Sequence, residues 1–527
     1  MLFLQPILII GVFWIHFVFG LNQIVIKGHK FFDSITKHQF FIKGVAYQPR
    51  TGNELVDPLA DPQACARDAT LMSKLGLNVV RVYEVDPKKN HDQCMKSFSD
   101  AGIYVLLDIA TPKNSINRKH PEYGLELFNG YKAAVDSFHD YDNMLAYMAG
   151  NEVTNDRTNT GASAFVKAAL RDIKQYIKLN KSKYLPVGYA SNDDENIREP
   201  IRDYFSCGDD ATQVDFYGVN LYEWCGKSSF ESSGYDERTK EFSKYNKPVF
   251  LSEFGCNLVS PRPFTEVQAI YSRPMTDVWS GGVAYEWTQE NNNYGLVKLS
   301  KSNSTQGTAK ADILADYTNL QTQLANAKPQ GAHMDNFNLV RSSPACPSHS
   351  NNWKASLNLP PTPSEKACTC LKNSVSCVAS DKVNLVDANG KSAIGAQLDI
   401  MCGLTPCDEI KGDGVSGKYG VFSYCGPKEK LTWLYHSYSQ NNMGACDFEG
   451  NALKVTPRRK QSIEACATME PSFEQGSGGD SADSDSDSST GDHGSSKSGA
   501  VPGSSAIYIQ QAFLGVFLFS LLPLFTS

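Results

Sequence analysis

The chain is 527 residues long and carries a formal net charge of −7 at pH 7. Residues 471–505 contain six acidic side chains and one basic side chain, so this segment accounts for −5 and all other residues for −2. A nearly neutral body lacks the basic surface that nucleic acid or anionic lipid requires, which excludes an electrostatic nucleic-acid binder. The composition favours a neutral polymer as the ligand.

The first 20 residues are apolar and contain no Asp, Glu, Lys or Arg. They end on Val18-Phe19-Gly20, with a small residue at the last position, and polar sequence begins at Asn22. This arrangement predicts a cleavable signal peptide over residues 1–20, although no basic residue precedes the apolar run. A membrane-spanning anchor is the alternative interpretation.

The other end of the chain repeats the apolar pattern. Residues 506–527 are apolar and follow a spacer rich in Ser, Gly and Asp, which is typical of a signal for a glycolipid (GPI) anchor. We expect attachment between Gly494 and Gly499, within the linker 471–505, and removal of the tail 506–527. An ordinary transmembrane tail is the alternative, which Gln510 and Gln511 disfavour. The protein is then expected at the outer leaflet of the plasma membrane or in the cell wall.

Fourteen cysteines, an even number, agree with export to an oxidising compartment. The spacing Cys368-Thr-Cys370 has no His close by in sequence, so a metal site is not expected, and neither is a cofactor. Asn303, in the sequence Asn303-Ser304-Thr305, is the predicted glycosylation site.

The part of the chain between the two ends is long enough for two domains. A Pro-rich spacer over residues 331–366 separates a first domain, 21–330, from a cysteine-rich module, 367–470. Eight short apolar runs with a strand's length recur in the first domain: 41–47, 77–83, 103–109, 145–152, 185–191, 214–224, 248–255 and 281–287. Helix-like segments such as 61–75 and 162–179 lie between them, which predicts an α/β fold with a closed (β/α)₈ barrel. An open doubly wound sheet is the alternative, but no glycine-rich loop follows the first run.

Carboxylates stand at the ends of the predicted strands, where the active site of such a barrel gathers. Glu152 ends the fourth run and Glu253 lies in the seventh, among amide and aromatic side chains. Cleavage of a glycosidic bond requires one carboxylic acid and a second carboxylate that attacks or activates water. Glu152 is the better acid/base because Asn151 beside it can hold a sugar hydroxyl, and Glu253 is the better nucleophile. The rival carboxylates are Glu84, Glu223 and Glu286.

Six segments together resemble the fungal β-1,3-glucanosyltransferases of glycoside hydrolase family 72: Phe41–Gln48, Asn78–Tyr83, Leu107–Pro112, Ala149–Val153, Leu251–Cys256 and Tyr285–Trp287. The resemblance implies the same roles for Glu152 and Glu253, in a retaining reaction that transfers one β-1,3-glucan chain to another. It also implies sugar-binding positions at Tyr83, Asn114, Ser115, Arg118, Asn151, Asp193, Arg198 and Tyr285. Gln48, Asp108 and Tyr222 are further candidates. We expect the protein to be a monomer that binds a glucan donor chain and a glucan acceptor chain.

The cysteine-rich part resembles the family 43 carbohydrate-binding modules, through Cys368-Thr-Cys370 and residues 445–452. The resemblance implies the disulfides Cys368–Cys425, Cys370–Cys466, Cys377–Cys446 and Cys402–Cys407, and in the barrel Cys65–Cys94, Cys207–Cys346 and Cys225–Cys256. Trp433, Tyr435 and Tyr438 form either a glucan-stacking strip or the core of this module. The rival functions are an endo-β-1,3-glucanase, a wall protein that binds glucan without turning it over, and a receptor or adhesin.

Overall fold

The structure is a computed structural model that describes residues 20–51, 54–300, 309–384, 393–442, 444–458, 461–471 and 473. The predicted glycosylation site Asn303, nearly all of the predicted signal peptide, and the predicted GPI signal lie outside these residues. No described helix is both long and apolar enough to cross a membrane. The described residues form two compact units, the first comprising 20–374, 407–426 and 461–473, and the second 375–406 and 427–458.

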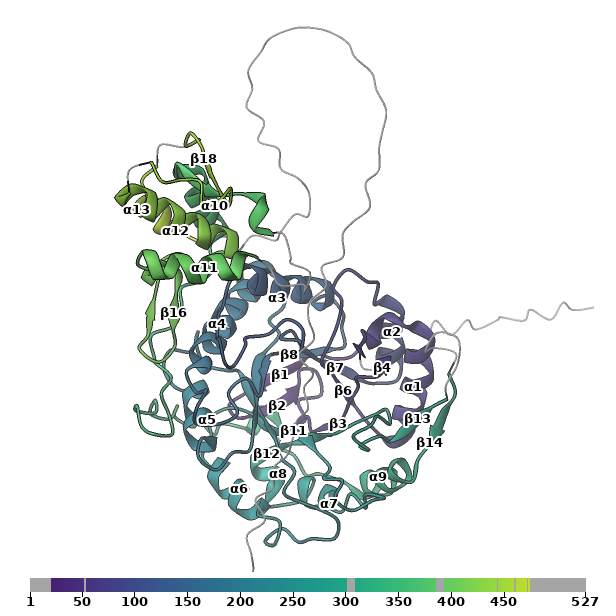
Figure 1. Cartoon of the computed structure of the whole chain (residues 1–527). Helices are drawn as coiled ribbons and strands as arrows, with labels where there is room; N and C mark the ends of the chain where they lie inside the picture. The colour runs from purple at the N-terminus through teal and green to yellow at the C-terminus, as the bar shows by residue number, and fades with distance from the viewer. Residues whose placement is uncertain are drawn as a thin grey trace, which may run out of the picture. The chain divides into compact units, whose positions relative to one another are not determined.

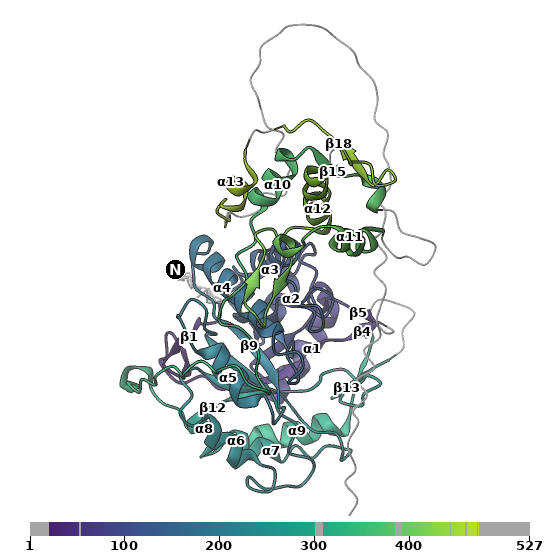
Figure 2. The same cartoon turned by 60° about the vertical axis from the view of Figure 1, so that its left-hand side comes forward.

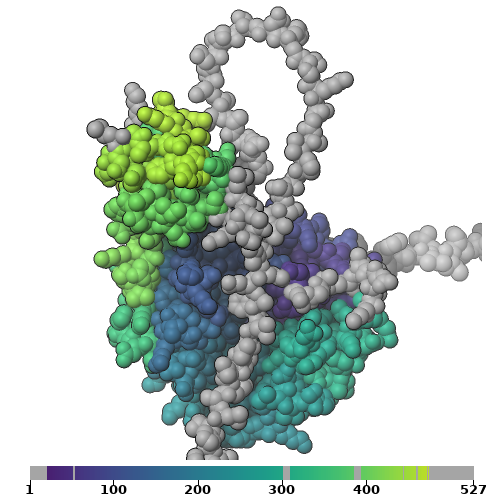
Figure 3. Space-filling model, in the orientation of Figure 1, coloured from purple at the N-terminus to yellow at the C-terminus, as the bar shows by residue number. Residues whose placement is uncertain are grey.

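Eight parallel strands form a closed barrel in the first unit (Figure 1). They are β3 (Ile42–Ala46), β6 (Val79–Val82), β7 (Tyr104–Asp108), β8 (Met144–Asn151), β9 (Val187–Asn192), β10 (Phe216–Asn220), β11 (Val249–Phe254) and β12 (Trp279–Ala284). The ring closes where Gly281–Ala284 of β12 pairs with Ile42–Val45 of β3. In the space-filling view of Figure 3, purple N-terminal segments and teal segments of the first unit lie next to each other on the surface. The predicted (β/α)₈ fold is therefore confirmed.

The strands are apolar on both faces because side chains fill the barrel inside and helices cover it outside. All residues of β6, β7, β10, β11 and β12 are buried. The covering helices are α1 (Pro62–Leu75), α2 (Asp92–Asp100), α3 (Leu125–Phe138), α4 (Ala162–Asn180), α5 (Arg198–Ser206), α6 (Tyr235–Phe242), α7 (Glu266–Ile270), α8 (Met275–Val278) and α9 (Ala315–Asn326). Figures 1 and 2 show these helices outside the ring of strands.

Local chemistry fixes where helix α1 begins and ends. The Asp61 side chain accepts a hydrogen bond from the N–H of Ala64, and Pro62 occupies the first turn, where its missing N–H costs nothing. Gly76 ends the helix in the left-handed conformation, with φ of 75°, which glycine adopts without strain. The helix connects β3 to β6, and these two strands are neighbours in the barrel.

A hairpin before the barrel closes one of its ends. It is formed by β1 (Ile24–Lys27) and β2 (Lys30–Asp33), which pair antiparallel. Ile24 and Phe31 pack in one apolar cluster with Ile42 and Phe216, the first residues of β3 and β10. This cluster plugs the amino-terminal end of the strands, so the opposite end, at the carboxyl ends, remains for a ligand site.

The cysteine-rich region is divided between the two units. Helices α10 (Glu365–Ser374) and α13 (Ile463–Ala467) and strands β16 (Gly412–Asp413) and β17 (Lys418–Tyr419) belong to the first unit. The second unit contains β15 (Cys377–Ala379), α11 (Ala393–Leu404), α12 (Pro427–Asn441) and β18 (Ala452–Lys454). Residues of the predicted module 367–470 therefore belong partly to the first unit and partly to the second.

The cysteine pairs in the structure are those that the family resemblance implies. Six disulfides join Cys65–Cys94, Cys207–Cys346, Cys225–Cys256, Cys368–Cys425, Cys370–Cys466 and Cys377–Cys446. Cys402 and Cys407 are also disulfide-bonded, and since the other twelve pair among themselves, these two pair with each other. In the second unit Tyr435 is fully buried and stacks on Phe448, at 4.3 Å between ring centroids. Tyr435 is therefore a core residue and not part of an exposed sugar-stacking strip.

Candidate active site

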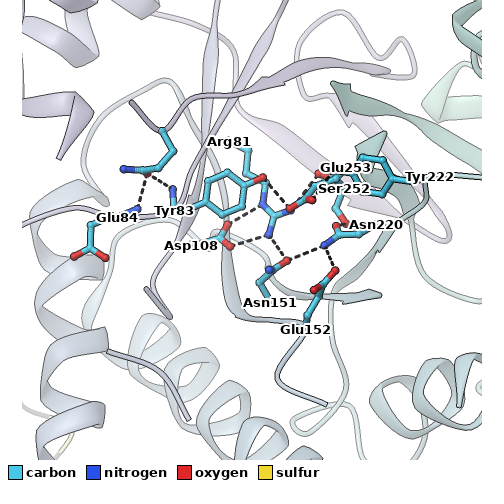
Figure 4. A network of polar contacts seen from close by, with 11 residues as sticks. Arg81, Tyr83, Glu84, Asp108, Asn151, Glu152, Asn220, Tyr222, Ser252 and Glu253 are labelled. Carbon is cyan, nitrogen blue, oxygen red and sulfur yellow. Dashed lines mark hydrogen bonds and ion pairs between the residues drawn. The ribbon is translucent and has the colours of Figure 1, made fainter. Parts of the chain in front are cut away.

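Glu152 and Glu253 meet at the carboxyl ends of the strands (Figure 4). Glu152 directly follows β8, with φ of 47°, in a region that residues other than glycine seldom occupy. Two hydrogen bonds hold it there: its N–H donates to the carbonyl oxygen of Ala190 at 2.9 Å, and Arg118 Nη2 donates to its carbonyl oxygen at 2.6 Å. Strained backbone that its surroundings hold so firmly is a common feature of active sites.

Arg81 lies at the centre of the site and contacts both halves of it. Its Nε and Nη2 donate to the two oxygens of Asp108, at 3.0 and 2.8 Å. Nη2 also donates to Asn151 Oδ1 at 2.9 Å, and Nη1 lies 3.5 Å from Glu253 Oε1. Arg81 is completely buried and Asp108 is 1% exposed. A buried guanidinium held by a fork-like carboxylate contact gives the site a fixed positive charge next to Glu253.

Two phenols orient the carboxylate of Glu253. Tyr83 donates to Oε1 at 3.1 Å, and Tyr222 donates to Oε2 at 2.9 Å. Burial raises the pKa of Glu253 to about 7, and the negative charge of Glu152 acts in the same direction. Arg81 and the hydrogen bonds from Tyr222 and Tyr83 oppose this rise, and the value of about 7 already includes their effect. The carboxylate is thereby desolvated while three donors favour its ionised form, which suits a nucleophile.

A separate chain of hydrogen bonds orients Glu152. Asn220, the last residue of β10, donates from Nδ2 to Glu152 Oε1 at 2.8 Å and to Asn151 Oδ1 at 3.2 Å. The hydroxyl of Ser252 donates to Asn220 Oδ1 at 2.7 Å, which fixes which end of the amide faces Glu152. Glu152 and Glu253 are therefore held by different neighbours, and the two sets meet at Arg81 and Asn151.

The structure places several of the other predicted sugar-binding residues in supporting roles. Gln48 accepts from the N–H groups of Tyr83 and Glu84, both at 2.9 Å, and donates to the carbonyl oxygen of Val56 at 2.7 Å. Asp108 uses both oxygens on Arg81. The polar groups of Gln48 and Asp108 are thus engaged with protein and hold the end of β6 in place.

The segment that follows β7 carries Asn114, Ser115 and Arg118. Asn114 is half-buried and lines a hollow of about 540 Å³ together with Glu84, Thr111 and Lys113, while Ser115 is exposed. On the opposite side, Tyr285 follows β12, and its ring meets that of Tyr294 edge-on at 5.3 Å. These residues lie around the strand ends, on both sides of Tyr83 in the order of the barrel.

Asp193 and Arg198 form an ion pair after β9, with 3.0 Å between Arg198 Nε and Asp193 Oδ1. The rival carboxylates contact neither Glu152 nor Glu253 among the described hydrogen bonds and ion pairs. Glu286 accepts from Asn292 at 2.7 Å, and Figure 4 shows Glu84 on the far side of Tyr83 from the network. No group of His, Cys, Asp and Glu among the described residues has the arrangement of a metal site.

Three residues of the site were not predicted as functional: Arg81, Asn220 and Ser252. Each is buried within a strand. Each also lies only one or two residues along the chain from a predicted site residue. A charged residue in the middle of an apolar strand, such as Arg81 between Val80 and Val82, is a signal that the sequence does contain. Such a charge needs a buried partner, which in this barrel is Asp108.

A closed (β/α)₈ barrel with two carboxylates at the strand ends, amides beside one and phenols beside the other, defines an enzyme that breaks glycosidic bonds. A sequence model described as glucanosyltransferase, glycoside hydrolase family 72, matches residues 16–328, and an X8 domain model matches residues 375–453. The chain belongs to the family 72 glucanosyltransferases. The family resemblance seen in the sequence is confirmed.

Relatives match along most of their own length. pH-responsive protein 1 of Candida albicans is 44% identical over 445 residues, which are 81% of this chain and 79% of that protein. The 1,3-beta-glucanosyltransferase GAS2 of Saccharomyces cerevisiae is 44% identical over 427 residues, 78% of this chain and 75% of that protein. A solved structure of Saccharomyces cerevisiae Gas2, in a Glu-to-Gln variant with laminaritetraose and laminaripentaose, is 41% identical to this chain, with a TM-score of 0.76. The matched region covers 85% of this chain and 97% of the Gas2 chain.

Proposed function

We propose that this chain is a retaining 1,3-β-glucanosyltransferase, which cuts an internal β-1,3 linkage of one glucan and joins the new reducing end to the non-reducing end of another. The observation that carries the proposal is Glu253, held by Arg81, Tyr83 and Tyr222, within electrostatic reach of Glu152. Complexes of the similar Gas2 with laminari-oligosaccharides support the choice of substrate.

In the first half of the reaction Glu253 attacks the anomeric carbon of the donor glucan. Glu152, protonated, gives its proton to the glycosidic oxygen, and the bond from that oxygen to the anomeric carbon breaks. The fragment that bears the former reducing end leaves, and a covalent glycosyl-enzyme on Glu253 remains. Glu253 loses its negative charge as the new bond forms. When that bond breaks, the charge returns, and Arg81 and the two phenols stabilise it again.

In the second half Glu152 is a base. It removes the proton from the terminal 3-hydroxyl of a second glucan, whose oxygen attacks the anomeric carbon and displaces Glu253. Two inversions at one carbon restore the β configuration, and the acceptor chain becomes longer. Water in place of the sugar hydroxyl gives hydrolysis, so the outcome depends on what occupies the space beside Glu152.

The remaining residues are assigned from their places around this pair. We assign Tyr83, Asn114, Ser115, Arg118, Asn151 and Tyr285 to the donor glucan. Asp193 and Arg198, which follow β9 next to Glu152, are assigned to the second glucan. Gln48 and Asp108 act through their neighbours, and Tyr222 acts on Glu253.

The protein is further proposed to work as a monomer on the outside of the cell. The apolar segments 1–20 and 506–527 support secretion and a GPI anchor, and a substrate in the cell wall fits that location. Anchorage is tested by treating intact cells with a phospholipase specific for GPI. Release of the protein into the medium supports the anchor, and retention opposes it.

The activity itself is tested with the full chain, purified from a eukaryotic host, and an end-labelled β-1,3-gluco-oligosaccharide of a single length. Mass spectrometry follows the lengths of the products. Products longer than the starting sugar establish transfer. Shorter products alone would identify an endo-β-1,3-glucanase, and unchanged sugar that still binds would identify a wall protein without turnover.

A further inference from the structure

Arg262, on the loop after β11, carries a buried guanidinium that the reaction described above does not use. Arg262 is 1% exposed, and its Nε donates to Asp316 Oδ2 at 2.5 Å. The backbone N–H of Arg262 donates to the other oxygen of Asp316 at 3.1 Å. Asp316 lies in the first turn of α9 and is itself buried. The carboxylate therefore compensates the charge of Arg262 and fixes the orientation of its guanidinium.

The other two nitrogens of this guanidinium hold three backbone carbonyls around the ends of β11 and β12. Nη1 donates to the carbonyl oxygen of Gly255 at 3.1 Å and to that of Tyr285 at 2.5 Å. Nη2 donates to the carbonyl oxygen of Tyr294 at 2.5 Å, and the same oxygen accepts from the N–H of Glu286 at 3.0 Å. Gly255 directly follows β11, and Tyr285 directly follows β12. One side chain thus ties together the ends of two neighbouring strands and the turn after the second.

Gly255 leaves the space that this arrangement needs. Its φ is 110°, a conformation that glycine adopts far more readily than other residues. A methyl group at this position would lie 3.2 Å from Arg262 Nη1 and 3.1 Å from the ring of Phe264. Because Arg262 is buried and its hydrogen bonds go to Asp316 and to the three carbonyls, it can act on a ligand only through the residues that it holds.

Those residues reach the nucleophile through a continuous series of contacts. The N–H of Tyr285 donates to the carbonyl oxygen of Phe254, the neighbour of Glu253, at 2.9 Å. The ring of Tyr285 lies 5.3 Å from that of Tyr294, which lies 5.9 Å from that of Tyr222, between centroids. The hydroxyl of Tyr222 donates to Glu253 at 2.9 Å. All three tyrosines are half-buried, so a row of partly exposed rings lies beside the nucleophile.

Such a row is suited to a sugar chain whose reacting carbon lies at Glu253. A tyrosine offers a flat apolar face for a sugar ring and a hydroxyl for a sugar hydroxyl. Tyr285 is assigned above to the donor glucan, and its side chain can serve there only while its backbone stays in place. Among the described hydrogen bonds, the backbone of Tyr285 is held by two: its N–H to Phe254 and its carbonyl oxygen to Arg262.

We infer that Arg262 is a positioning residue for the donor glucan: it holds Tyr285 beside Glu253 through a backbone carbonyl and contacts no sugar itself. Lysine cannot replace it, because an ammonium is a single point charge that cannot span Asp316 and three carbonyls. The inference rests on the proposed function, which supplies both the glucan and the role of Tyr285.

The test measures the initial rate at which a laminari-oligosaccharide donor of one length is consumed, over a range of concentrations. Arg262→Lys is expected to raise the donor KM about tenfold and to change kcat less than about threefold, because a donor-binding side chain acts before and at the transition state alike. Tyr285→Ala alone should also raise the donor KM. In the double variant Arg262→Lys/Tyr285→Ala, the KM should stay within about twofold of that of Tyr285→Ala, because Arg262 has lost the residue through which it acts.

Arg171→Lys is the matched control. Arg171 also pairs with an aspartate, Asp172, at 2.7 Å, and donates to a backbone carbonyl, that of Pro360, at 3.0 Å. It lies on α4, and no described interaction joins it to the loops after β11 and β12. Arg171→Lys should therefore lower Tm and leave the donor KM unchanged.

Asp316→Asn is a second variant, close in shape to the wild type. It withdraws one of the two acceptor oxygens that hold Arg262, so the guanidinium is fixed less firmly. The donor KM should rise about threefold, and again only while Tyr285 is present. If Arg262→Lys does not fold, the Asp316→Asn series decides by the same comparison.

Three results would overturn the inference: a donor KM that neither Arg262→Lys nor Asp316→Asn changes, effects that multiply in the double variant with Tyr285→Ala, or an equal rise of KM in Arg171→Lys. A wild type that consumes no glucan contradicts the proposed function instead. A wild type that yields only shorter products contradicts transfer, while its donor KM still tests the role of Arg262, so the failures are distinguishable.

Discussion

Arg81 and Asp108 form a buried ion pair through two parallel hydrogen bonds, and the same guanidinium reaches Asn151 on one side and Glu253 on the other. A charge in the interior of a barrel is costly unless a partner of opposite charge accompanies it. Asp108 compensates Arg81, so that Arg81 can present its remaining N–H groups to the two halves of the site.

This relationship predicts that stability and activity can be separated. Arg81→Met leaves Asp108 buried without a partner and should lower the free energy of unfolding by about 3–5 kcal/mol. The double variant Arg81→Met/Asp108→Leu removes both charges and should recover most of that loss, while glucan transfer stays abolished. Thermal denaturation and the oligosaccharide assay measure the two quantities. A double variant as unstable as the single one would show that the pair is not the origin of the cost.

Glu253→Gln is expected to bind glucan and to lose turnover by at least about 10³-fold, because an amide cannot attack the anomeric carbon. Its shape allows the hydrogen bonds from Tyr83 and Tyr222 to be replaced in part, so binding should remain within severalfold of the wild type. Isothermal calorimetry with a laminari-oligosaccharide checks binding, and mass spectrometry checks turnover. Near-normal turnover would transfer the role of nucleophile to another carboxylate.

The hydroxyl of Tyr222 should set part of the pH profile. It donates to Glu253 Oε2 and lowers the pKa of that carboxyl, against the effect of burial. The nucleophile must be ionised, so kcat/KM falls as the pH drops through the pKa of Glu253. Tyr222→Phe removes a donor, raises that pKa, and should move the acid limb of the kcat/KM profile to higher pH.

Tyr294→Phe is the control for this shift. Its ring packs edge-on against Tyr222, at 5.9 Å between centroids, but no described hydrogen bond joins it to Glu253. The Tyr294 variant should leave the acid limb in place. An equal shift in both variants would mean that packing, and not the hydrogen bond, controls the titration of Glu253.

Much of this architecture could be predicted from the sequence, because a strand that is buried on both faces is a continuous apolar run. The run 77–83 contains β6 (Val79–Val82), and the run 145–152 contains most of β8. That Glu152 and Glu253 lie at the same end of the barrel could be predicted because the carboxyl ends of the strands meet at one edge. Alternation along the chain also separates Tyr222, which donates to Glu253, from its neighbour Glu223, which contacts neither Glu152 nor Glu253 among the described hydrogen bonds and ion pairs.

The roles of buried polar residues could not be predicted in the same way. Gln48 has the chemistry of a sugar ligand, but its amide is engaged by the backbone of Tyr83, Glu84 and Val56. Arg81 and Asn220 acquire their roles only from partners that are distant in sequence: Asp108, Glu152 and Ser252. Sequence gives the residue type, whereas the function of an amide or a guanidinium depends on which neighbours use its donors and acceptors.

Ser252 is expected to support catalysis without touching the substrate. Its hydroxyl fixes the amide of Asn220, which in turn donates to Glu152. Ser252→Ala frees the amide to rotate and should lower kcat about tenfold while KM changes little, since the loss is one oriented hydrogen bond. Ser191→Ala, a buried serine in β9, is the control and should leave kcat unchanged. A large change in KM for Ser252→Ala would place this serine in substrate binding instead.

Two disulfides of similar span allow the stability of the barrel to be distinguished from the precision of the site. Cys225–Cys256 joins the segment after β10, which carries Tyr222, to the segment after β11, the strand that contains Glu253, over a separation of 31 residues. Cys65–Cys94 joins α1 to α2 over 29 residues, away from both catalytic carboxylates. Loops of nearly equal length should give nearly equal stabilisation, about 3–4 kcal/mol each.

Replacing either pair by serines should therefore lower Tm by a similar amount. Only the loss of Cys225–Cys256 should also lower kcat at a temperature where both variants are folded, because Tyr222 then no longer moves together with Glu253. Equal losses of kcat in the two variants would mean that both disulfides act on activity through global stability alone.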